Sequence, residues 1–165
     1  MLTLAPWLIF LHVLSAITFF LGHGTSVAMA FQIRKEKDLV RIRAMLDLSE
    51  STLIVTFVAF LIMGLSGLAL PFLLKIWGKG WIWASIVLMV IVFLQMTFMN
   101  EKRYKILRKL VGLPYRQGNT VFPAEAPASQ AEVEAHIQKL NMGELVVVGY
   151  VIPMIVLWLM VFKPF

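Results

Sequence analysis

Two histidines on one apolar stretch are the residues of this chain best suited to chemistry. His12 and His23 are eleven positions apart. On a helix this spacing brings them to within about 20° of the same face and about 16 Å apart along the axis. An imidazole in hydrocarbon is costly and normally faces the interior of a helix bundle. Both side chains are therefore predicted to point inward, toward a ligand or a polar partner.

Haem b is the first ligand to consider for this stripe. A haem iron needs a neutral inward-facing histidine, a small residue where the macrocycle lies against the helix, and a second axial ligand or an open position. Gly22 and Ser26 share the stripe and leave room for a macrocycle. We therefore predict a cofactor site of His12, His23, Gly22 and Ser26, in which His12 ligates the haem iron.

The second axial ligand is not evident in the sequence. Two histidines eleven residues apart on one helix cannot bind one iron from opposite sides, and the later apolar stretches contain no histidine. The candidates are a symmetry mate, a chain of another kind, or one of the methionines Met63, Met89 and Met96.

A purely structural interpretation of both histidines stays open. His12 would then hydrogen-bond a backbone carbonyl or a serine near the outer interface, and His23 would bridge two helices. The ten methionines are scattered along the chain, which favours packing over a copper site. The chain has no cysteine, and it shows no nucleophile–base pair or phosphate loop, so the sequence leaves enzymatic activity undecided.

The elements that position these histidines are predicted to be membrane-spanning helices. Of the 165 residues, 60% are hydrophobic, and the mean hydropathy of +0.85 indicates an apolar environment. A spanning helix needs about 20 mostly apolar residues. Such stretches cover about 6–33, 52–74, 81–99 and 145–162. They predict a single all-α transmembrane domain over 1–165, a bundle of four spanning helices in contact with the lipid bilayer.

Lysine and arginine are concentrated in two of the three predicted loops. The loops after the first and third stretches hold most of them, whereas the second loop has only Lys75 and Lys79. Because basic loops remain in the cytoplasm, both termini are predicted to face outward. The net charge of +6 is thus attributed to membrane topology, and no nucleic acid partner is expected.

A cytoplasmic region of about 101–142 separates the third and fourth stretches. The first and third spans are predicted to continue as helix over 35–48 and 101–111, since neither segment contains Pro or Gly. Residues 112–127 are rich in Gly, Pro, Asn and Gln and predict a loop.

A short amphipathic helix is predicted before the fourth span. Ser129 and Glu132 have the spacing of a capping box. They precede apolar positions at helical spacing, Val133, Ile137 and Leu140. We expect this helix to lie on the cytoplasmic face or against a partner, with His136 solvated.

Small residues predict where the spanning helices cross. In lipid, helices associate through close contact of small side chains and through polar pairs. Four-residue spacing on the first span and a one-turn pair on the second mark the predicted crossing points: Gly22, Ser26, Ala30, Gly64 and Gly67. Pro71 and Pro153 each remove a backbone donor and are predicted to bend their helices.

The first 100 residues or so resemble a known family. The resemblance is carried by Leu11-His12-Val13-Leu14-Ser15-Ala16-Ile17, Gly22, the basic loop, Gly64, Gly67 and Trp83. This pattern resembles a family of predicted bacterial integral membrane proteins of unassigned function. It is more distantly similar to the membrane domain of copper-resistance protein D and to the four-helix, haem-containing protoporphyrinogen oxidase of bacteria. The resemblance implies a multi-pass protein of the bacterial inner (plasma) membrane in which His12 is a haem ligand. A third-span lysine that the oxidase comparison implies is missing from 81–99.

Two functional classes follow from these observations. The first is a haem-b-binding, redox-associated membrane protein that uses His12 and also His23. The second is a non-catalytic accessory or structural subunit, which docks onto other membrane subunits or forms a homo-oligomer through its small-residue stripes and amphipathic helix.

Overall fold

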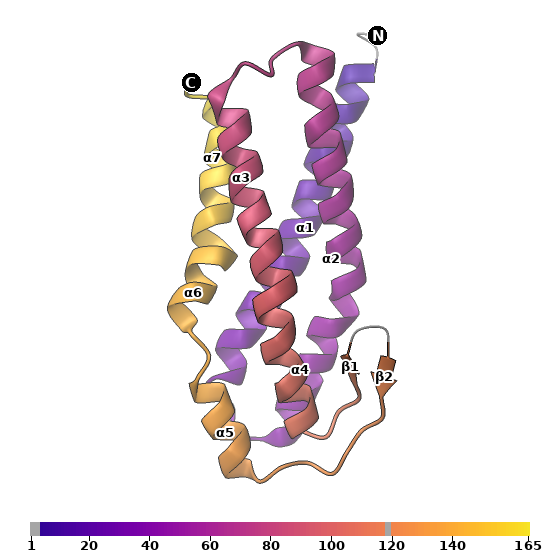
Figure 1. The fold of residues 1–165 in the computed structure, drawn as a ribbon, viewed down its shortest axis with the longest axis vertical. Coiled ribbons are helices and arrows are strands. Elements are labelled where there is room, and N and C mark those ends of the chain that lie inside the picture. The colour runs from indigo at the N-terminus through magenta and orange to yellow at the C-terminus, as the bar shows by residue number, and fades with distance from the viewer. Residues whose placement is uncertain (1–3, 118–119) are drawn as a thin grey trace.

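The computed structural model describes residues 4–117 and 120–165, and helices dominate it (Figure 1). In chain order its elements are α1 (Ala5–Ile33), α2 (Leu39–Leu74), α3 (Gly80–Leu94), the π-helical segment η2 (Gln95–Asn100), α4 (Glu101–Leu110), β1 (Tyr115–Gln117), β2 (Thr120–Phe122), α5 (Gln130–Gln138), α6 (Met142–Val146), the π-helical segment η3 (Val147–Val151) and α7 (Ile152–Phe162).

Four helical stretches of the described residues are long and apolar enough to cross a membrane, which confirms the predicted number of spans. They cover Ala5–Ile33, Leu39–Leu74, Gly80–Leu110 and Met142–Phe162. Between 17% and 39% of the most apolar window in each is buried inside the protein. Most side chains of the spans therefore face outward, as contact with lipid requires.

The spans are arranged as two helix pairs that share one apolar core. α1 packs along α2, and α3 packs along α7. Phe19 of α1, Met63 of α2, Val92 of α3 and Val156 of α7 belong to the same buried cluster and join the pairs. The beginning of α1 and the C-terminus lie at one end of the bundle, and α5 and the β1–β2 hairpin lie at the other (Figure 1).

The helix predicted to extend the first span belongs instead to the second span. α1 ends at Ile33, and residues 39–48 form the beginning of α2. Asp38 ends the turn, because its backbone is extended and its carboxylate accepts a hydrogen bond from the Val40 N–H at 2.8 Å. An N-cap of this kind satisfies a free backbone N–H of the first turn and so favours the start of a new helix at this point. The prediction that 35–48 continue the first helix was therefore wrong, because residues 39–48 belong to α2.

Glu36 stabilises the same turn from the other side. Its carboxylate accepts hydrogen bonds from the backbone N–H groups of Asp38 and Lys37, at 3.1 and 2.9 Å. These bonds lower the pKa of Glu36 below its usual value, with a smaller contribution from Arg41. The ionised carboxylate thus helps to hold the chain reversal between α1 and α2.

The region after the third span is more ordered than the sequence predicts. The predicted continuation of the third span is confirmed, through η2 and α4 to Leu110. Within the predicted loop, β1 and β2 form an antiparallel hairpin in which Tyr115 pairs with Phe122. Strands of three residues are too short to give a recognisable alternating pattern, which explains why the sequence did not reveal them.

The amphipathic helix α5 packs onto its own chain. Ser129 and Glu132 form the predicted capping box. Val133, Ile137 and Leu140 are all buried. Val133 and Ile137 lie in a cluster with residues of α1, α2 and α4. His136 is half-buried, with Nε2 at 3.3 Å from the Arg103 carbonyl oxygen, and is therefore not the fully solvated side chain that was expected.

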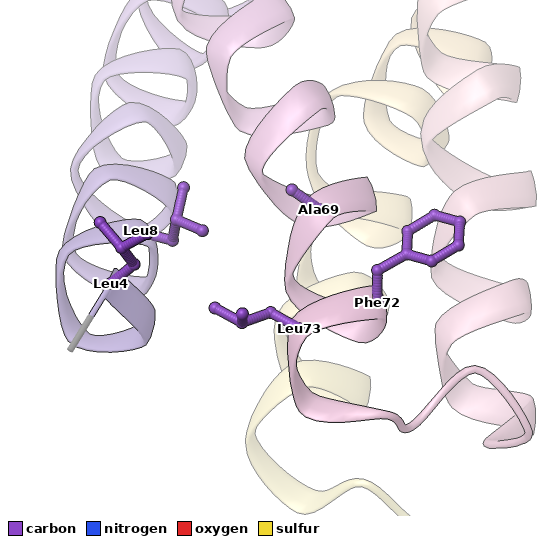
Figure 2. Close-up of a pocket in the computed structure, with 5 residues that line it drawn as sticks. All are labelled: Leu4, Leu8, Ala69, Phe72 and Leu73. Atoms are coloured by element: carbon purple, nitrogen blue, oxygen red, sulfur yellow. The ribbon is translucent and has the colours of Figure 1, made fainter. Parts of the chain in front are cut away.

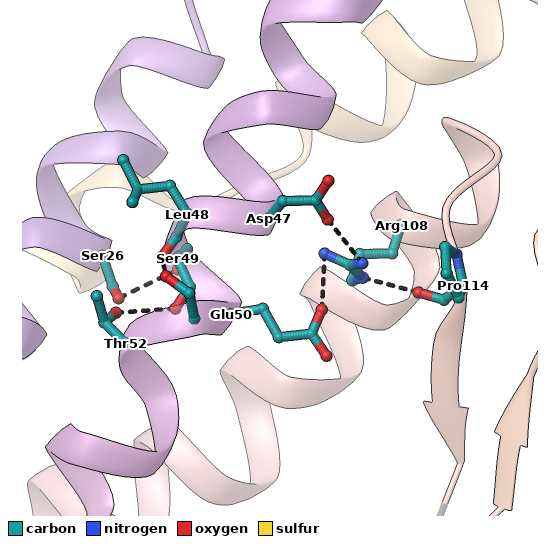
Figure 3. A network of polar contacts seen from close by, with 9 residues as sticks. Ser26, Asp47, Leu48, Ser49, Glu50, Thr52, Arg108 and Pro114 are labelled. Atoms are coloured by element: carbon teal, nitrogen blue, oxygen red, sulfur yellow. Dashed lines mark hydrogen bonds and ion pairs between the residues drawn. The ribbon is translucent and has the colours of Figure 1, made fainter.

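Arginine side chains hold the polar end of the bundle together. Arg108 of α4 donates to Asp47 at 2.9 Å and to the Pro114 carbonyl at 2.9 Å, and it forms an ion pair with Glu50 at 2.8 Å (Figure 3). Its side chain is only 12% exposed. A partly desolvated cation with several acceptors binds more strongly than an exposed surface pair. Arg108 thus ties α4 to the beginning of α2.

Two further arginines satisfy carbonyl groups at helix ends. Arg34 donates to the carbonyl oxygen of Leu140, just after α5, at 2.7 Å. Arg43 donates to the carbonyl oxygen of Val111, just after α4, at 2.6 Å. The last carbonyls of a helix have no partner within the helix. Residues that the sequence explains only as topology signals therefore also have a structural role.

Candidate functional site

His12 is hydrogen-bonded to α2 through one ring nitrogen. Its Nδ1 lies 2.9 Å from the carbonyl oxygen of Met63 and 3.1 Å from Oγ of Ser66. A carbonyl oxygen only accepts, so Nδ1 carries the proton. The Ser66 hydroxyl donates to the Ile62 carbonyl at 2.6 Å, which leaves its oxygen free to accept from His12. Nε2 consequently holds a lone pair, and it has no hydrogen-bond partner within the described residues.

The His12 ring fits against α2 because position 67 is a glycine. A Cβ atom added to Gly67 would lie 2.9 Å from Cε1 of His12, closer than real Cβ contacts. Gly67 therefore allows a close approach between α1 and α2. The hydrogen bonds of Nδ1 confirm the prediction that His12 contacts a carbonyl or a serine. The same arrangement also orients the imidazole as second-shell partners orient metal-binding histidines.

His23 lies deeper in the protein than His12. Its residue surface is 4% exposed, and its ring stacks on Phe19 with centroids 5.3 Å apart. Nε2 is buried and lacks a hydrogen-bond partner among the described residues. The backbone of Val148 in η3 lies near the ring. The predicted hydrogen bond of His23 between two helices stays a prediction, and one ring nitrogen is left without a partner among the described residues.

The π-helical segment near His23 leaves one backbone carbonyl without its usual partner. In η3 the N–H of Ile152 bonds to the carbonyl of Val147, five residues earlier. In that register the Val148 carbonyl would pair with the N–H of residue 153, which is Pro153 and has none. The Val148 carbonyl oxygen is thus left without a backbone partner in this register.

A small groove lies beside His23, between α1 and the η3–α7 segment. Its volume is about 180 Å³. Apolar and aromatic residues of both helices surround it: Phe20, His23, Gly24, Gly149, Tyr150, Pro153, Met154 and Leu157. A Cβ added to Gly24 would meet nothing within 4 Å, whereas one added to Gly149 would lie 2.7 Å from Val27. Gly149 therefore sets the approach of η3 to α1, and Gly24 leaves the groove open.

The other predicted small residues have different neighbours. A Cβ on Gly22 would overlap Oγ1 of Thr56, and Ser26 accepts a hydrogen bond from Ser49 at 3.1 Å (Figure 3). Ala30 is fully buried. Gly64 meets nothing within 4 Å among the described residues, so the expectation of a crossing point there is wrong. The close contact between α1 and α2 lies instead at Gly67, one turn further along α2, where the His12 ring packs against the helix.

A second groove is formed by the beginning of α1 and the last turns of α2. It has a volume of about 460 Å³ and is lined by Leu4, Leu8, Ala69, Phe72 and Leu73 (Figure 2). All five side chains are apolar and carry no group able to orient a polar ligand. Neither groove includes His12 among its lining residues. Within the described residues, no three His, Cys, Asp or Glu side chains lie close enough to hold a metal ion.

Four long apolar helices with outward-facing side chains fit a multi-pass α-helical membrane protein. No family model matches this chain, and neither a curated protein nor a solved structure is similar to it. The family resemblance described above therefore stays a prediction, and the functional proposal depends on the site itself.

Proposed function

We propose that this chain is a redox-associated membrane protein that binds haem b through Nε2 of His12. The observation that supports it is the hydrogen bond from Nδ1–H to the Met63 carbonyl at 2.9 Å. Such a bond fixes the tautomer, orients the ring and makes the free nitrogen more basic. Bound haem would supply one-electron chemistry. The chain itself would supply the oriented imidazole and an apolar surrounding.

His12 is a better iron ligand than His23 on two geometric grounds. His12 is half-buried, and its free nitrogen is not enclosed by neighbouring atoms, whereas Nε2 of His23 is buried. In addition, the groove beside His23 has about 180 Å³, which is too little to enclose a macrocycle. Gly22 and Ser26 contact α2 and would have no part in its binding.

The second axial position would come from outside this chain. Met63 is buried in the core, and Met89 and Met96 pack against the same cluster, so all three are occupied in packing. His136 lies on α5, toward the opposite end of the bundle (Figure 1). A second copy of the chain or another membrane subunit would therefore cover the haem and complete its coordination, unless the position stays open.

A reduced-minus-oxidised absorption spectrum of the purified protein in detergent tests this proposal. The wild type is expected to show a Soret shift and a sharp α band, His12→Ala to lose both, and the matched variant His23→Ala to keep them. Thermal unfolding of each variant separates loss of haem from loss of fold. A featureless wild-type spectrum, after haem has been supplied during expression, would sink the proposal and favour the accessory subunit.

The proposed orientation places the polar end of the bundle, with α5 and the hairpin, in the cytoplasm of a bacterium. It is supported by the concentration of basic residues at that end. Because the chain has no cysteine, single-cysteine variants give a direct test. Lys37→Cys should react with an impermeant maleimide only after the membrane is opened, and Gly78→Cys should react in intact cells. The reverse pattern would invert the topology.

A further inference from the structure

Gln95 places an amide side chain in the apolar part of the third span. It follows directly after the 15 residues of α3, which is about 22 Å along a helix. Because the hydrocarbon core of a bilayer is about 30 Å thick, this position lies within it. The side chain is half-buried, neither of its amide atoms is enclosed, and no described residue forms a hydrogen bond with it.

Hydroxyl groups of the same spans are satisfied within their own helices. Ser15, Thr56 and Ser85 each donate to the carbonyl oxygen four residues earlier, at 2.7, 2.8 and 2.8 Å. The Gln95 amide has no such bond. Lipid offers no water to an unpaired polar group, so an unpaired amide there is costly. Glutamine side chains in spanning helices bond across to a neighbouring helix, and we expect the partner of Gln95 outside this chain.

The surface beside Gln95 is apolar and uncovered. Ile91, one turn earlier, and Phe98 are 44% and 58% exposed, whereas Val92 is fully buried. Gln95 thus lies at the edge between the packed face and the exposed face of the third span. No residue from 80 to 98 is charged. A partner on this face therefore meets one neutral amide within an apolar surface.

We infer that the exposed face around Gln95 binds the same face of a second copy of this chain, with the two Gln95 amides hydrogen-bonded to each other. A carboxamide carries a donor and an acceptor on one planar group. Two copies related by a twofold axis can therefore form a closed pair of N–H···O=C bonds. Twofold interfaces are self-complementary and are the commonest in homo-oligomers. This inference does not depend on haem at His12.

Disulfide cross-linking of the full chain in vesicles of phosphatidylcholine and phosphatidylglycerol tests the inference. The chain has no cysteine, so each single variant reports on one position. Ile91→Cys should form a dimer with an apolar oxidant, because residues one turn from a twofold contact lie close together. Val58→Cys is the matched control on α2 and should stay monomeric. Its wild-type residue is 46% exposed and lies at a similar depth, since Phe60 stacks on Phe93 at 5.2 Å.

Removal of the amide provides a second test in the Ile91→Cys background. Gln95→Leu keeps a side chain of similar size without a polar group. It should raise the dissociation constant of the dimer about tenfold, measured as the cross-linked fraction across protein-to-lipid ratios. Gln95→Asn retains a carboxamide and should retain the dimer. The thermal unfolding midpoint of Gln95→Leu in detergent should not fall, because the amide has no partner within the described residues.

Three results would overturn the inference. Ile91→Cys chains that stay monomeric at every protein-to-lipid ratio would exclude a second copy as the partner. Undiminished cross-linking in Gln95→Leu would exclude the amide as the contact. A lower unfolding midpoint in Gln95→Leu would show that the amide is bonded within its own chain.

Discussion

His12 and His23 lie on the same helix, yet they occupy different environments. His12 donates Nδ1–H to the Met63 carbonyl of α2, whereas no hydrogen-bond partner is found among the described residues for the buried Nε2 of His23. His12 is half-buried and packs against Gly67 of α2, whereas the surface of His23 is only 4% exposed. The difference shows that one residue type on one helix face can be oriented and accessible at one depth and enclosed by packing at another.

The largest effect on this comparison is expected from removing the imidazole at His23. The Val148 backbone lies near this ring, and its carbonyl has no backbone partner in the π register. His23→Phe removes the polar group nearest to that carbonyl and should lower the free energy of unfolding by about 1–3 kcal/mol. Pro153→Ala supplies a backbone N–H in the position that the π register pairs with this carbonyl. The double variant should therefore recover part of the loss, by about 1 kcal/mol, measured as a double-mutant cycle in detergent unfolding. Additive effects would contradict the link between Pro153 and His23.

Gly149→Ala should come next, because it drives η3 away from α1. The new Cβ would lie 2.7 Å from Val27, whose branched side chain cannot easily move. Overpacking of this kind costs about 1–3 kcal/mol. A fall in the thermal unfolding midpoint is expected, whereas the spectrum of haem bound at His12 should stay unchanged. A change in that spectrum would show that the two regions are coupled.

A smaller effect is expected at the glycine beneath His12. Gly67→Ala would place a Cβ 2.9 Å from Cε1 of the ring, which can tilt aside. We expect a loss of about 1 kcal/mol and a shifted α band, because the imidazole moves. Gly64→Ala is the matched control, since its Cβ meets nothing, and it should raise stability by about 0.5–1 kcal/mol through helix propensity. Equal losses in both variants would argue against the ring contact.

Ser66→Ala should have the smallest effect. Its Oγ lies 3.1 Å from Nδ1 of His12, but the Met63 carbonyl at 2.9 Å remains as an acceptor. The expected loss is at most about 0.5–1 kcal/mol, with haem still bound. Unfolding in detergent and the absorption spectrum measure the two quantities. Complete loss of haem in this variant would mean that Ser66, and not the carbonyl, orients the imidazole.

The sequence was sufficient for features that depend on local chemistry. Hydropathy over about 20 residues predicted the four spans, and the spacing of Ser129 and Glu132 predicted the cap of α5. It was misleading where a polar residue had an unexpected local role, as at Asp38, which starts α2 within a segment assigned to the first helix. The hairpin in the predicted loop was also missed, because its strands are too short to show a pattern.

Only part of the candidate site could be predicted from the sequence. The inward stripe of His12 and His23 followed from their spacing, because the helical repeat alone places both on one face. Which nitrogen of His12 is left free depends on a carbonyl group that approaches from another helix. Every residue has such a carbonyl, so the sequence contains no mark of the ones that matter. Only the packing of α2 against α1 selected the Met63 carbonyl as the partner of His12.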